Sequence, residues 1–338
     1  ENPLEVPQVN GVKVAANTSG KYYYTPDASD AQTVLNVTWA VDTDPKAYVI
    51  DEVLTAFVSE TSPVNIDGSN YYSFDNLTYA VAALGGAEGV VILASDVTLT
   101  GGDSAAFVDK AGREPVTIKG LTGNEVLCID GTLGFKGDIT LDNFTLQVLK
   151  STYAKYLNGW SDVTFGENFK VDTENGGFVY FASSSYTGKG DGNQTITVNG
   201  GSFDAFHIAG AYNTLAPGNF VRVIFNGGST RYLNLGFAEN DKGTVGSDIC
   251  VEVNADVISS KTISYQADKT VLEGDPTISV IFNGGITGYT FTSEAETVVD
   301  YKIYSAVGGI VTLYEEGDGK TFLLTPVGEK FPKVNGSF

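Results

Sequence analysis

The chain has 338 residues, a mass of 35.7 kDa and a formal net charge of −21, from 41 acidic and 20 basic side chains. Such a field repels phosphate backbones and anionic lipid, which argues against nucleic acid and anionic membrane surfaces as partners. Its 40 glycines, 10 prolines and hydrophobic fraction of 42% favour many short strands and turns over disorder.

The sequence also bears on where the protein works. Methionine is absent, so we expect a processed or engineered chain whose leader was removed before Glu1. No stretch approaches 18 consecutive apolar residues, so no membrane span is predicted. Cys128 and Cys250 are too few for a disulfide framework or a zinc site, and we interpret both as strand residues.

Six Asn-x-Ser/Thr sequons fit a secreted protein, although a chain rich in these residues yields several by chance. They lie at Asn17, Asn36, Asn76, Asn143, Asn193 and Asn335. We therefore expect an extracellular or cell-surface location.

Residues 1–70 differ in pattern from the remainder. Val9–Ala15 and Thr33–Ala40 alternate like strands. Asp44 and the proline after it resemble the start of a helix, and apolar residues follow at roughly helical spacing. We predict a short helix over 45–58, although its β-branched residues also suit a strand.

A second helix is predicted over Asp75–Leu84, where Asp75 can cap the first turn and Gly85 can end the last. Its apolar stripe consists of Leu77, Ala80, Val81 and Leu84. Strands are predicted next over Val90–Ala94 and from Val97 to Thr100.

After these strands the chain repeats itself, because short apolar strands each end in a turn and the turns recur at similar intervals. The turns begin at Lys119, Asp142, Gly166, Asn199, Asn226, Asn254 and Asn283. Ala94 precedes the first of these turns by an interval of the same size, so it is a candidate start of the series. A second apolar strand follows most turns, as in Phe203–Ile208, Tyr232–Leu235 and Tyr289–Phe291.

This period predicts a β-solenoid, in which each coil buries its apolar face by stacking on its neighbours. Loop insertions in the coils account for the uneven spacing. Asn and Gly tolerate positive φ where the chain turns a corner, and stacked Asn side chains can form a hydrogen-bonded ladder. A β-sandwich array is the alternative, but it predicts closely spaced strands without a longer period.

The helix Asp75–Leu84, the strand Val90–Ala94, and the V-T-I-K-G and V-N-G-G-S-F coils resemble the right-handed parallel β-helix, or pectin-lyase-like, superfamily. The resemblance covers roughly residues 74–300 and looks closest to non-enzymatic bacterial surface proteins of this fold. It implies an all-β fold in which an N-terminal helix often caps the first coil.

The regions at the two ends complete the expected organisation. We expect residues 1–70 to form an N-terminal α/β cap or a small β-rich domain, 71–300 a parallel β-helix, and 301–338 a C-terminal β cap. Ile303–Tyr314 and Thr321–Thr325 flank a polar turn, which predicts a β-hairpin that covers the edge of the last coil.

Polysaccharide cleavage is the first enzyme class to consider for such a fold. The resemblance implies Asn-Thr-Asp, Asp-Asp, Gly-His-Gly and Arg-x-Lys motifs for polygalacturonases, and none of them occurs. An atypical lyase or hydrolase site would have to use His207 as a general base with Asp204 and Arg231. A lone His without such partners is more often structural, so we predict no catalytic residues.

No cofactor is predicted. Acidic loop residues such as Asp42, Asp44, Asp191 and Glu315 offer oxygen ligands of the kind calcium takes, but no D-x-D-x-D-G loop is present. We therefore interpret them as a solvated acidic surface, with calcium as the alternative.

Aromatic residues give the strongest suggestion of a binding site. Tyr153, Tyr156 and Trp160 share one face if their segment is helical, and Tyr186 lies in the next long insertion. Such faces stack on sugars or on protein partners, or they pack on the wall of the solenoid.

We therefore expect a secreted, non-catalytic β-helix that acts in adhesion, by binding a polysaccharide, a surface glycan or a protein partner. The alternatives are the atypical polysaccharide lyase or hydrolase and a self-assembling subunit of a surface layer or filament.

Overall fold

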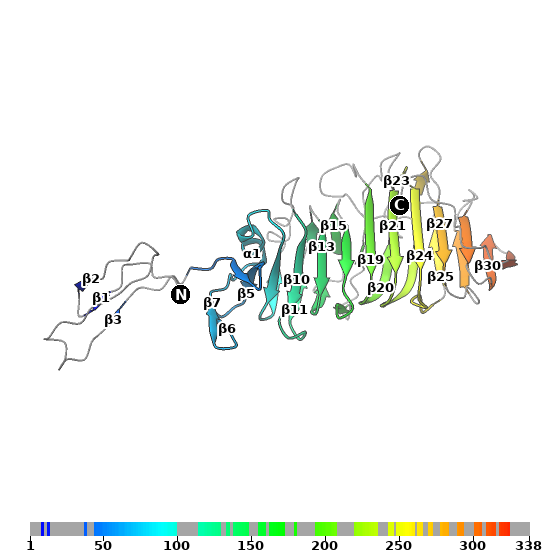
Figure 1. Cartoon of the computed structure of the whole chain (residues 1–338). Helices are drawn as coiled ribbons and strands as arrows, with labels where there is room; N and C mark the ends of the chain where they lie inside the picture. The colour runs from blue at the N-terminus through cyan, green and yellow to red at the C-terminus, as the bar shows by residue number, and fades with distance from the viewer. Residues whose placement is uncertain are drawn as a thin grey trace.

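A computed structural model describes residues 8–9, 12–13, 37–38, 44–99, 114–129, 133–135, 138–148, 155–159, 162–172, 179–180, 193–207, 220–235, 243–246, 248–260, 262–265, 270–272, 278–283, 289–293, 301–305, 309–315 and 318–324. Over these residues the chain is a β-solenoid, whose strands lie side by side in long sheets along one axis (Figure 1). This confirms the predicted fold class and excludes the β-sandwich alternative. The right-handed sense of the coil and the capping role of the two ends stay predictions.

The longest sheet within the described residues has 11 strands, which pair in parallel except for the antiparallel pair β4–β5. In spatial order they are β4 (Tyr48–Ile50), β5 (Val53–Val58), β8 (Gly89–Leu93), β10 (Val116–Gly120), β13 (Ile139–Asp142), β16 (Val163–Phe165), β19 (Gln194–Val198), β21 (Phe220–Phe225), β24 (Asp248–Val253), β27 (Ile278–Phe282) and β29 (Tyr301–Ser305).

Two further sheets stack in the same way over the described coils. One contains β9 (Val97–Leu99), β11 (Val126–Ile129), β14 (Thr145–Val148) and β17 (Lys170–Asp172). The other contains β12 (Leu133–Phe135), β15 (Lys155–Gly159), β18 (Val179–Tyr180), β20 (Ser202–His207), β22 (Ser229–Asn234), β25 (Thr262–Tyr265), β28 (Tyr289–Ser293), β30 (Gly309–Glu315) and β31 (Asp318–Leu324). A C-terminal hairpin is present as predicted, because β30 and β31 pair antiparallel. Its first predicted strand, Ile303–Tyr314, contains parts of both β29 and β30, which belong to different sheets.

Smaller elements accompany the long sheets. The pairs are β6 (Val64–Ile66) with β7 (Ser69–Tyr71), and β23 (Gly243–Val245) with β26 (Thr270–Leu272). A separate sheet contains β1 (Gln8–Val9), β2 (Val12–Lys13) and β3 (Val37–Thr38). Strand β3 lies within the predicted strand Thr33–Ala40, but the single strand predicted over Val9–Ala15 is wrong, because Val9 of β1 pairs antiparallel with Val12 of β2. In the described part of the chain the only helix is α1 (Leu77–Ala83), and no described helix has the length and apolar character to cross a membrane.

The register of the longest sheet reproduces the predicted repeat. The residues that precede the seven turns are lateral partners from strand to strand, so the interval between successive turns is the length of one coil. They are Ile118, Leu141, Phe165, Val198, Phe225, Val253 and Phe282. The predicted start of the series is slightly displaced, because Ile92 and not Ala94 is the partner of Lys119.

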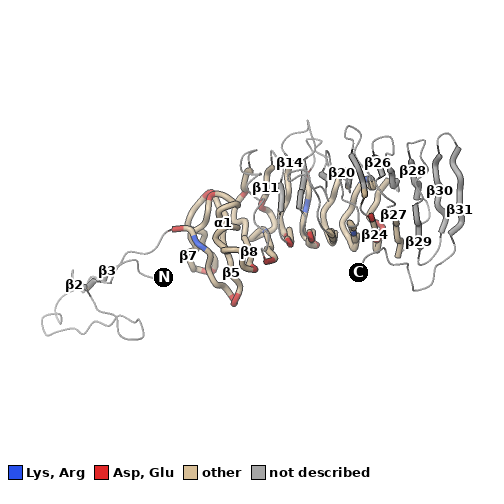
Figure 2. The backbone as a smooth tube through the Cα atoms, turned by 90° about the horizontal axis from the view of Figure 1, so that it is seen from above, with Lys and Arg blue, Asp and Glu red and all other residues tan. Residues whose placement is uncertain are grey.

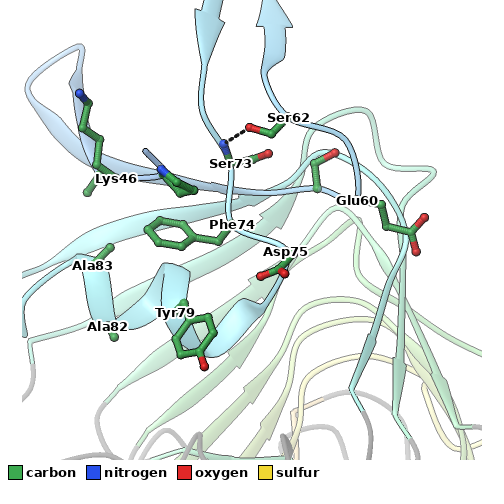
Figure 3. A pocket seen from close by; sticks show the side chains of 12 residues that line it. Lys46, Glu60, Ser62, Ser73, Phe74, Asp75, Tyr79, Ala82 and Ala83 are labelled. Carbon is green, nitrogen blue, oxygen red and sulfur yellow. Dashed lines mark hydrogen bonds between the residues drawn. The ribbon is translucent and has the colours of Figure 1, made fainter. Parts of the chain in front are cut away.

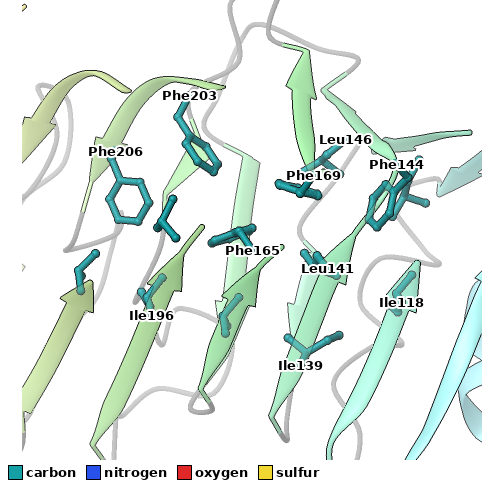
Figure 4. Packing of buried hydrophobic residues seen from close by; sticks show 14 of the residues in the cluster. Ile118, Ile139, Leu141, Phe144, Leu146, Phe165, Phe169, Ile196, Phe203 and Phe206 are labelled. Carbon is teal, nitrogen blue, oxygen red and sulfur yellow. The ribbon is translucent and has the colours of Figure 1, made fainter. Parts of the chain in front are cut away.

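The core lies inside the coils and is rich in phenylalanine (Figure 4). The Phe165 ring centroid lies 5.1 Å from that of Phe169 and 5.4 Å from that of Phe203, and Phe206 lies 5.1 Å from Phe225. Phe165 and Phe169 belong to one coil, whereas the pairs Phe165–Phe203 and Phe206–Phe225 join neighbouring coils. Burying one such side chain contributes about 1.5–3 kcal/mol, and only coil stacking makes that burial possible.

A ladder of asparagine amides runs along the exposed turns, as the Asn-Gly-Gly pattern predicts. Nδ2 of Asn226 donates to Oδ1 of Asn199 at 2.9 Å, and Nδ2 of Asn254 donates to Oδ1 of Asn226 at 2.7 Å. Asn283 donates to Asn254 in the same sense. We call Asn199, Asn226, Asn254 and Asn283 the asparagine ladder.

The predicted helix over 45–58 is wrong. This segment forms β4 and β5, joined by Asp51 and Glu52, which both have positive φ. Strand β5 pairs with β8 and contacts α1, which buries the consecutive residues from Thr55 to Val58. The pairing with β8 therefore outweighs the helical spacing of the apolar residues, and the segment forms strands, which its β-branched residues also favour.

The prediction that both cysteines lie in strands is confirmed. Cys128 lies in β11 and Cys250 in β24, and both are free thiols.

Candidate functional site

An open groove of about 830 Å³ lies beside α1, near the end of the solenoid formed by β4 and β5 (Figure 3). Its lining comes from four places: the segment before β4, the turn after β5, the segment that runs into α1, and α1 itself. The side chains that give it chemical character are Lys46, Glu60, Ser62, Phe74, Asp75 and Tyr79.

The segment before α1 is fixed to the longest sheet by backbone hydrogen bonds. The N–H of Phe74 donates to the carbonyl of Phe57 at 2.8 Å, and the N–H of Ser59 donates to the carbonyl of Phe74 at 2.9 Å. Phe74 also forms a parallel bridge with Val58. These contacts hold the half-buried Phe74 ring in the groove.

Helix α1 then positions Tyr79. Asn76, rather than the predicted Asp75, is the N-cap, and its Oδ1 accepts a hydrogen bond of 2.7 Å from the Thr78 N–H. Gly85 ends the helix with φ of 66°, as predicted. The predicted apolar stripe of Leu77, Ala80, Val81 and Leu84 is buried. Tyr79 lies off this stripe and is 62% exposed, so its ring is available along the groove.

The opposite wall is a turn braced by hydroxyl groups. Ser62 Oγ accepts from the Ser73 N–H at 3.1 Å, and Ser73 Oγ donates to the Thr61 carbonyl at 3.3 Å. The Glu60 N–H donates to Ser95 Oγ at 3.0 Å. Both walls are therefore fixed before any ligand arrives, which lowers the entropy lost on binding.

The groove offers the rings of Phe74 and Tyr79 and two carboxylates to a ligand. Asp75 and Glu60 are exposed, and the structure gives neither carboxylate a partner among the described residues. Nζ of Lys46 lies 5.7 Å from the ring centroid of Tyr48. Acidic positions also recur along the described coils, with few basic ones between them (Figure 2). The setting favours a neutral or cationic ligand over an anionic one.

The aromatic residues predicted to bind a ligand are only partly placed. Tyr153, Trp160 and Tyr186 lie outside the described residues. Tyr156 lies in β15 and pairs with Tyr180 of β18, so the condition of a helical segment, on which the shared aromatic face depended, is not met over residues 155–159. The strand here follows from the parallel pairing of β15 with β12 and β18.

The residues of the alternative catalytic site lie on two neighbouring strands. Phe203 pairs with Thr230 and Ala205 with Tyr232, and this register sets Asp204 opposite Arg231. His207 lies further along β20, opposite Tyr180 and Asn234. The register therefore brings Asp204 and Arg231 together, and it leaves His207 at the end of the strand.

No metal site emerges from the residues that the structure describes, since they contain no group of three or more His, Cys, Asp and Glu arranged to hold an ion. Asp42 and Asp191, which were considered as calcium ligands, lie outside these residues. The possibility of calcium binding stays untested.

Sequence reasoning missed the groove, although a signal was present. The apolar stripe of the helix over Asp75–Leu84 was predicted correctly, and Tyr79 lies outside this stripe. An exposed aromatic side chain on the polar side of a helix does not contribute to the core, so it is a candidate for contact with a ligand. The part of the lining that follows β5 could not be predicted, because β5 itself was predicted as part of a helix over 45–58.

Comparison with known proteins gives no further lead. No protein-family model matches the chain, and no curated protein and no solved structure shows significant similarity to it.

Proposed function

We propose that this chain is a non-catalytic binding protein of the cell surface or extracellular space, and that its β-solenoid presents the groove beside α1 to a neutral carbohydrate. The observation that carries the proposal is Tyr79, a ring 62% exposed on a capped helix at the edge of a braced groove. The resemblance to non-enzymatic pectin-lyase-like surface proteins supports the same class of function.

A sugar ring matches the chemistry of the groove. Its apolar face can stack on the Tyr79 ring, and its hydroxyl groups can donate to the carboxylates of Asp75 and Glu60. A polyuronate matches poorly, because its carboxylates would meet the two acidic side chains and a net charge of −21.

The test is a pull-down of the full chain on a panel of immobilised neutral and acidic polysaccharides, with and without calcium. We expect retention on at least one neutral polysaccharide, and a loss of about tenfold in affinity for Tyr79→Ala because a stacked aromatic anchor is removed. Tyr79→Phe should keep most of the affinity, and Asp75→Asn should weaken it.

Matched controls come from the same region and from the other candidate segment. Glu88→Gln removes an exposed carboxylate outside the groove and should leave binding unchanged. The double variant Tyr153→Ala/Trp160→Ala tests the aromatic segment in the same assay. If retention is unchanged in Tyr79→Ala but lost in this double variant, the binding site lies in the aromatic segment and not in the groove.

The register of Asp204 and Arg231 keeps polysaccharide cleavage as a second candidate. The supernatant of the pull-down is therefore assayed for released sugar. Release that is lost in Asp204→Asn would overturn the non-catalytic proposal. Neither retention nor release would favour assembly of copies into a surface layer or filament, which negative-stain microscopy would reveal as ordered arrays.

A further inference from the structure

Two turns of the asparagine ladder have the same local sequence but different surroundings. Residues 199–202 and 226–229 both read Asn-Gly-Gly-Ser, and they stack on each other in adjacent coils. An Asn followed by Gly is chemically labile, because glycine has no side chain to hinder attack of its backbone nitrogen on the amide. The two turns therefore form a matched pair within one molecule.

At the second turn both reacting groups are engaged. Nδ2 of Asn226, which would leave, donates to Asn199 Oδ1 at 2.9 Å. The N–H of Gly227, which would attack, donates to the Val198 carbonyl at 3.1 Å. Reaction at Asn226 requires both hydrogen bonds to break.

At the first turn the described residues provide no hydrogen-bond partner to either reacting group. The ladder runs in one direction, so Asn199 uses only its amide oxygen, as the acceptor for Asn226. Within the described residues the structure gives no partner to Nδ2 of Asn199 or to the N–H of Gly200. Reaction at this turn therefore requires no described hydrogen bond of the two reacting groups to break, although Gly200 itself is buried.

We propose that Asn199 is a site of spontaneous deamidation in the folded protein and that the ladder protects Asn226. The nitrogen of Gly200 attacks Cγ of Asn199, the Cγ–Nδ2 bond breaks, and ammonia leaves with the proton from Gly200. Water then opens the cyclic imide to give aspartate or isoaspartate at position 199.

The direction of the ladder also makes an aspartate at position 199 compatible with the fold. A carboxylate there still accepts the hydrogen bond from Asn226, and the bond becomes charge-assisted. An acid at position 226 or 254 would lose the donor to the preceding coil and face its amide oxygen. Position 199 is therefore the ladder residue, among those with both neighbours described, that can change without losing a ladder hydrogen bond.

The test is peptide mapping by mass spectrometry of the full wild-type chain, incubated at mildly alkaline pH in the folded state and in denaturant. In denaturant the two Asn-Gly-Gly-Ser peptides should convert at similar rates. In the folded chain we expect position 199 to convert about tenfold faster than position 226, because two hydrogen bonds protect the latter. Gly200→Ala is no substitute for this control, because a Cβ there would collide with the Gly166 carbonyl.

The outcome is decisive because exposure predicts the reverse order. Asn226 is exposed and Asn199 is half-buried, so a rate governed by solvent access alone would favour Asn226. Equal rates in the folded chain, or faster conversion at 226, would overturn the proposal. So would conversion of both peptides in denaturant with no conversion at 199 in the folded chain over the same time.

Discussion

The Thr122 hydroxyl donates a hydrogen bond of 2.7 Å to Oε1 of Glu125, a carboxylate side chain that is only 6% exposed. The backbone N–H of Thr122 also donates to it at 3.0 Å, and that of Gly123 donates at 2.9 Å. Glu125 thus acts as the anchor of the turn between β10 and β11. Burial alone would raise its pKa, but these donors outweigh burial and lower the pKa below 4.5.

Glu125 should make stability depend on pH at the acidic end. Because its pKa is lower in the folded state, its contribution is fully present above about pH 4.5 and is lost as pH falls through the folded pKa. We expect Glu125→Gln to lower the free energy of unfolding by about 1–2 kcal/mol at pH 7, since the amide NH₂ faces N–H donors. Denaturant titrations from pH 7 to pH 3 should show this difference shrinking.

Glu114→Gln is the matched control, because Glu114 is exposed in the same coil. It should change stability little at any pH. A difference between wild type and Glu125→Gln that stays constant down to pH 3 would contradict the role assigned to the charge.

The ionised form of Asp162 should destabilise the folded state at neutral pH. Partial desolvation raises its pKa above 3.8 although the residue is exposed, the Asp138 charge raises it further, and the hydrogen bond from the Thr195 N–H only partly offsets these effects. Asp162→Asn keeps that acceptor and removes the repulsion. Because Asp162 is exposed and solvent screens its charge, we expect only a small rise in melting temperature at pH 7, corresponding to no more than about 0.5 kcal/mol.

The sign of this effect also follows from the pKa. A carboxyl whose folded pKa is raised destabilises the fold above that pKa, so the gain in Asp162→Asn should vanish as pH falls towards 3.8. Asp138→Asn should give part of the same gain, and the double variant should be less than additive. Fully additive effects would show that the two carboxylates do not interact.

Cys250 should be inert until the chain unfolds. Burial raises the pKa of its thiol to about 11, and the nearby Glu252 charge adds to the effect. The side chain is 0% exposed, whereas Cys128 is partly exposed. A thiol reagent at pH 8 should therefore label Cys128 alone, slowly because its pKa is also raised, and label both thiols in denaturant. Labelling of folded Cys128→Ala would refute this.

The asparagine ladder should respond to charge according to its direction. Asn226→Asp removes the donor to Asn199 and places a carboxylate beside its amide oxygen, so we expect a loss of about 1 kcal/mol in the free energy of unfolding. Asn199→Asp keeps the acceptor and should change it by less than about 0.5 kcal/mol. Denaturant titration at pH 7 compares the two, and equal losses would show that the ladder contributes no directional stability.

The repeat was readable from sequence because it is a local pattern that recurs. A solenoid coil meets only its neighbours, so each must present apolar residues at the same place and turn with residues that tolerate the corner. The register of Ile118, Leu141 and Phe165 therefore follows from spacing alone, and so does the ladder that begins at Asn199.

Segments without a repeat gave no such constraint. The helix predicted over 45–58 is two strands, because β8 supplies the pairing partner of β5. The local sequence suited both structures, through its helical spacing and its β-branched residues, and did not decide between them. Tyr156 illustrates the same limit, because its strand depends on parallel partners in the preceding and following coils, which are distant in the sequence. In both places long-range pairing outweighs local spacing.

The sequence by itself determined that this protein is an acidic solenoid of stacked strands with asparagine turns, because periodicity and turn chemistry are written into consecutive residues. Only the tertiary structure decided which side chains share a surface. The groove joins Lys46, Glu60 and Tyr79 from segments that local patterns do not connect, and the direction of the ladder separates Asn199 from Asn226 although both begin the same Asn-Gly-Gly-Ser sequence. Such differences arise from the neighbouring coil, which the local sequence does not contain.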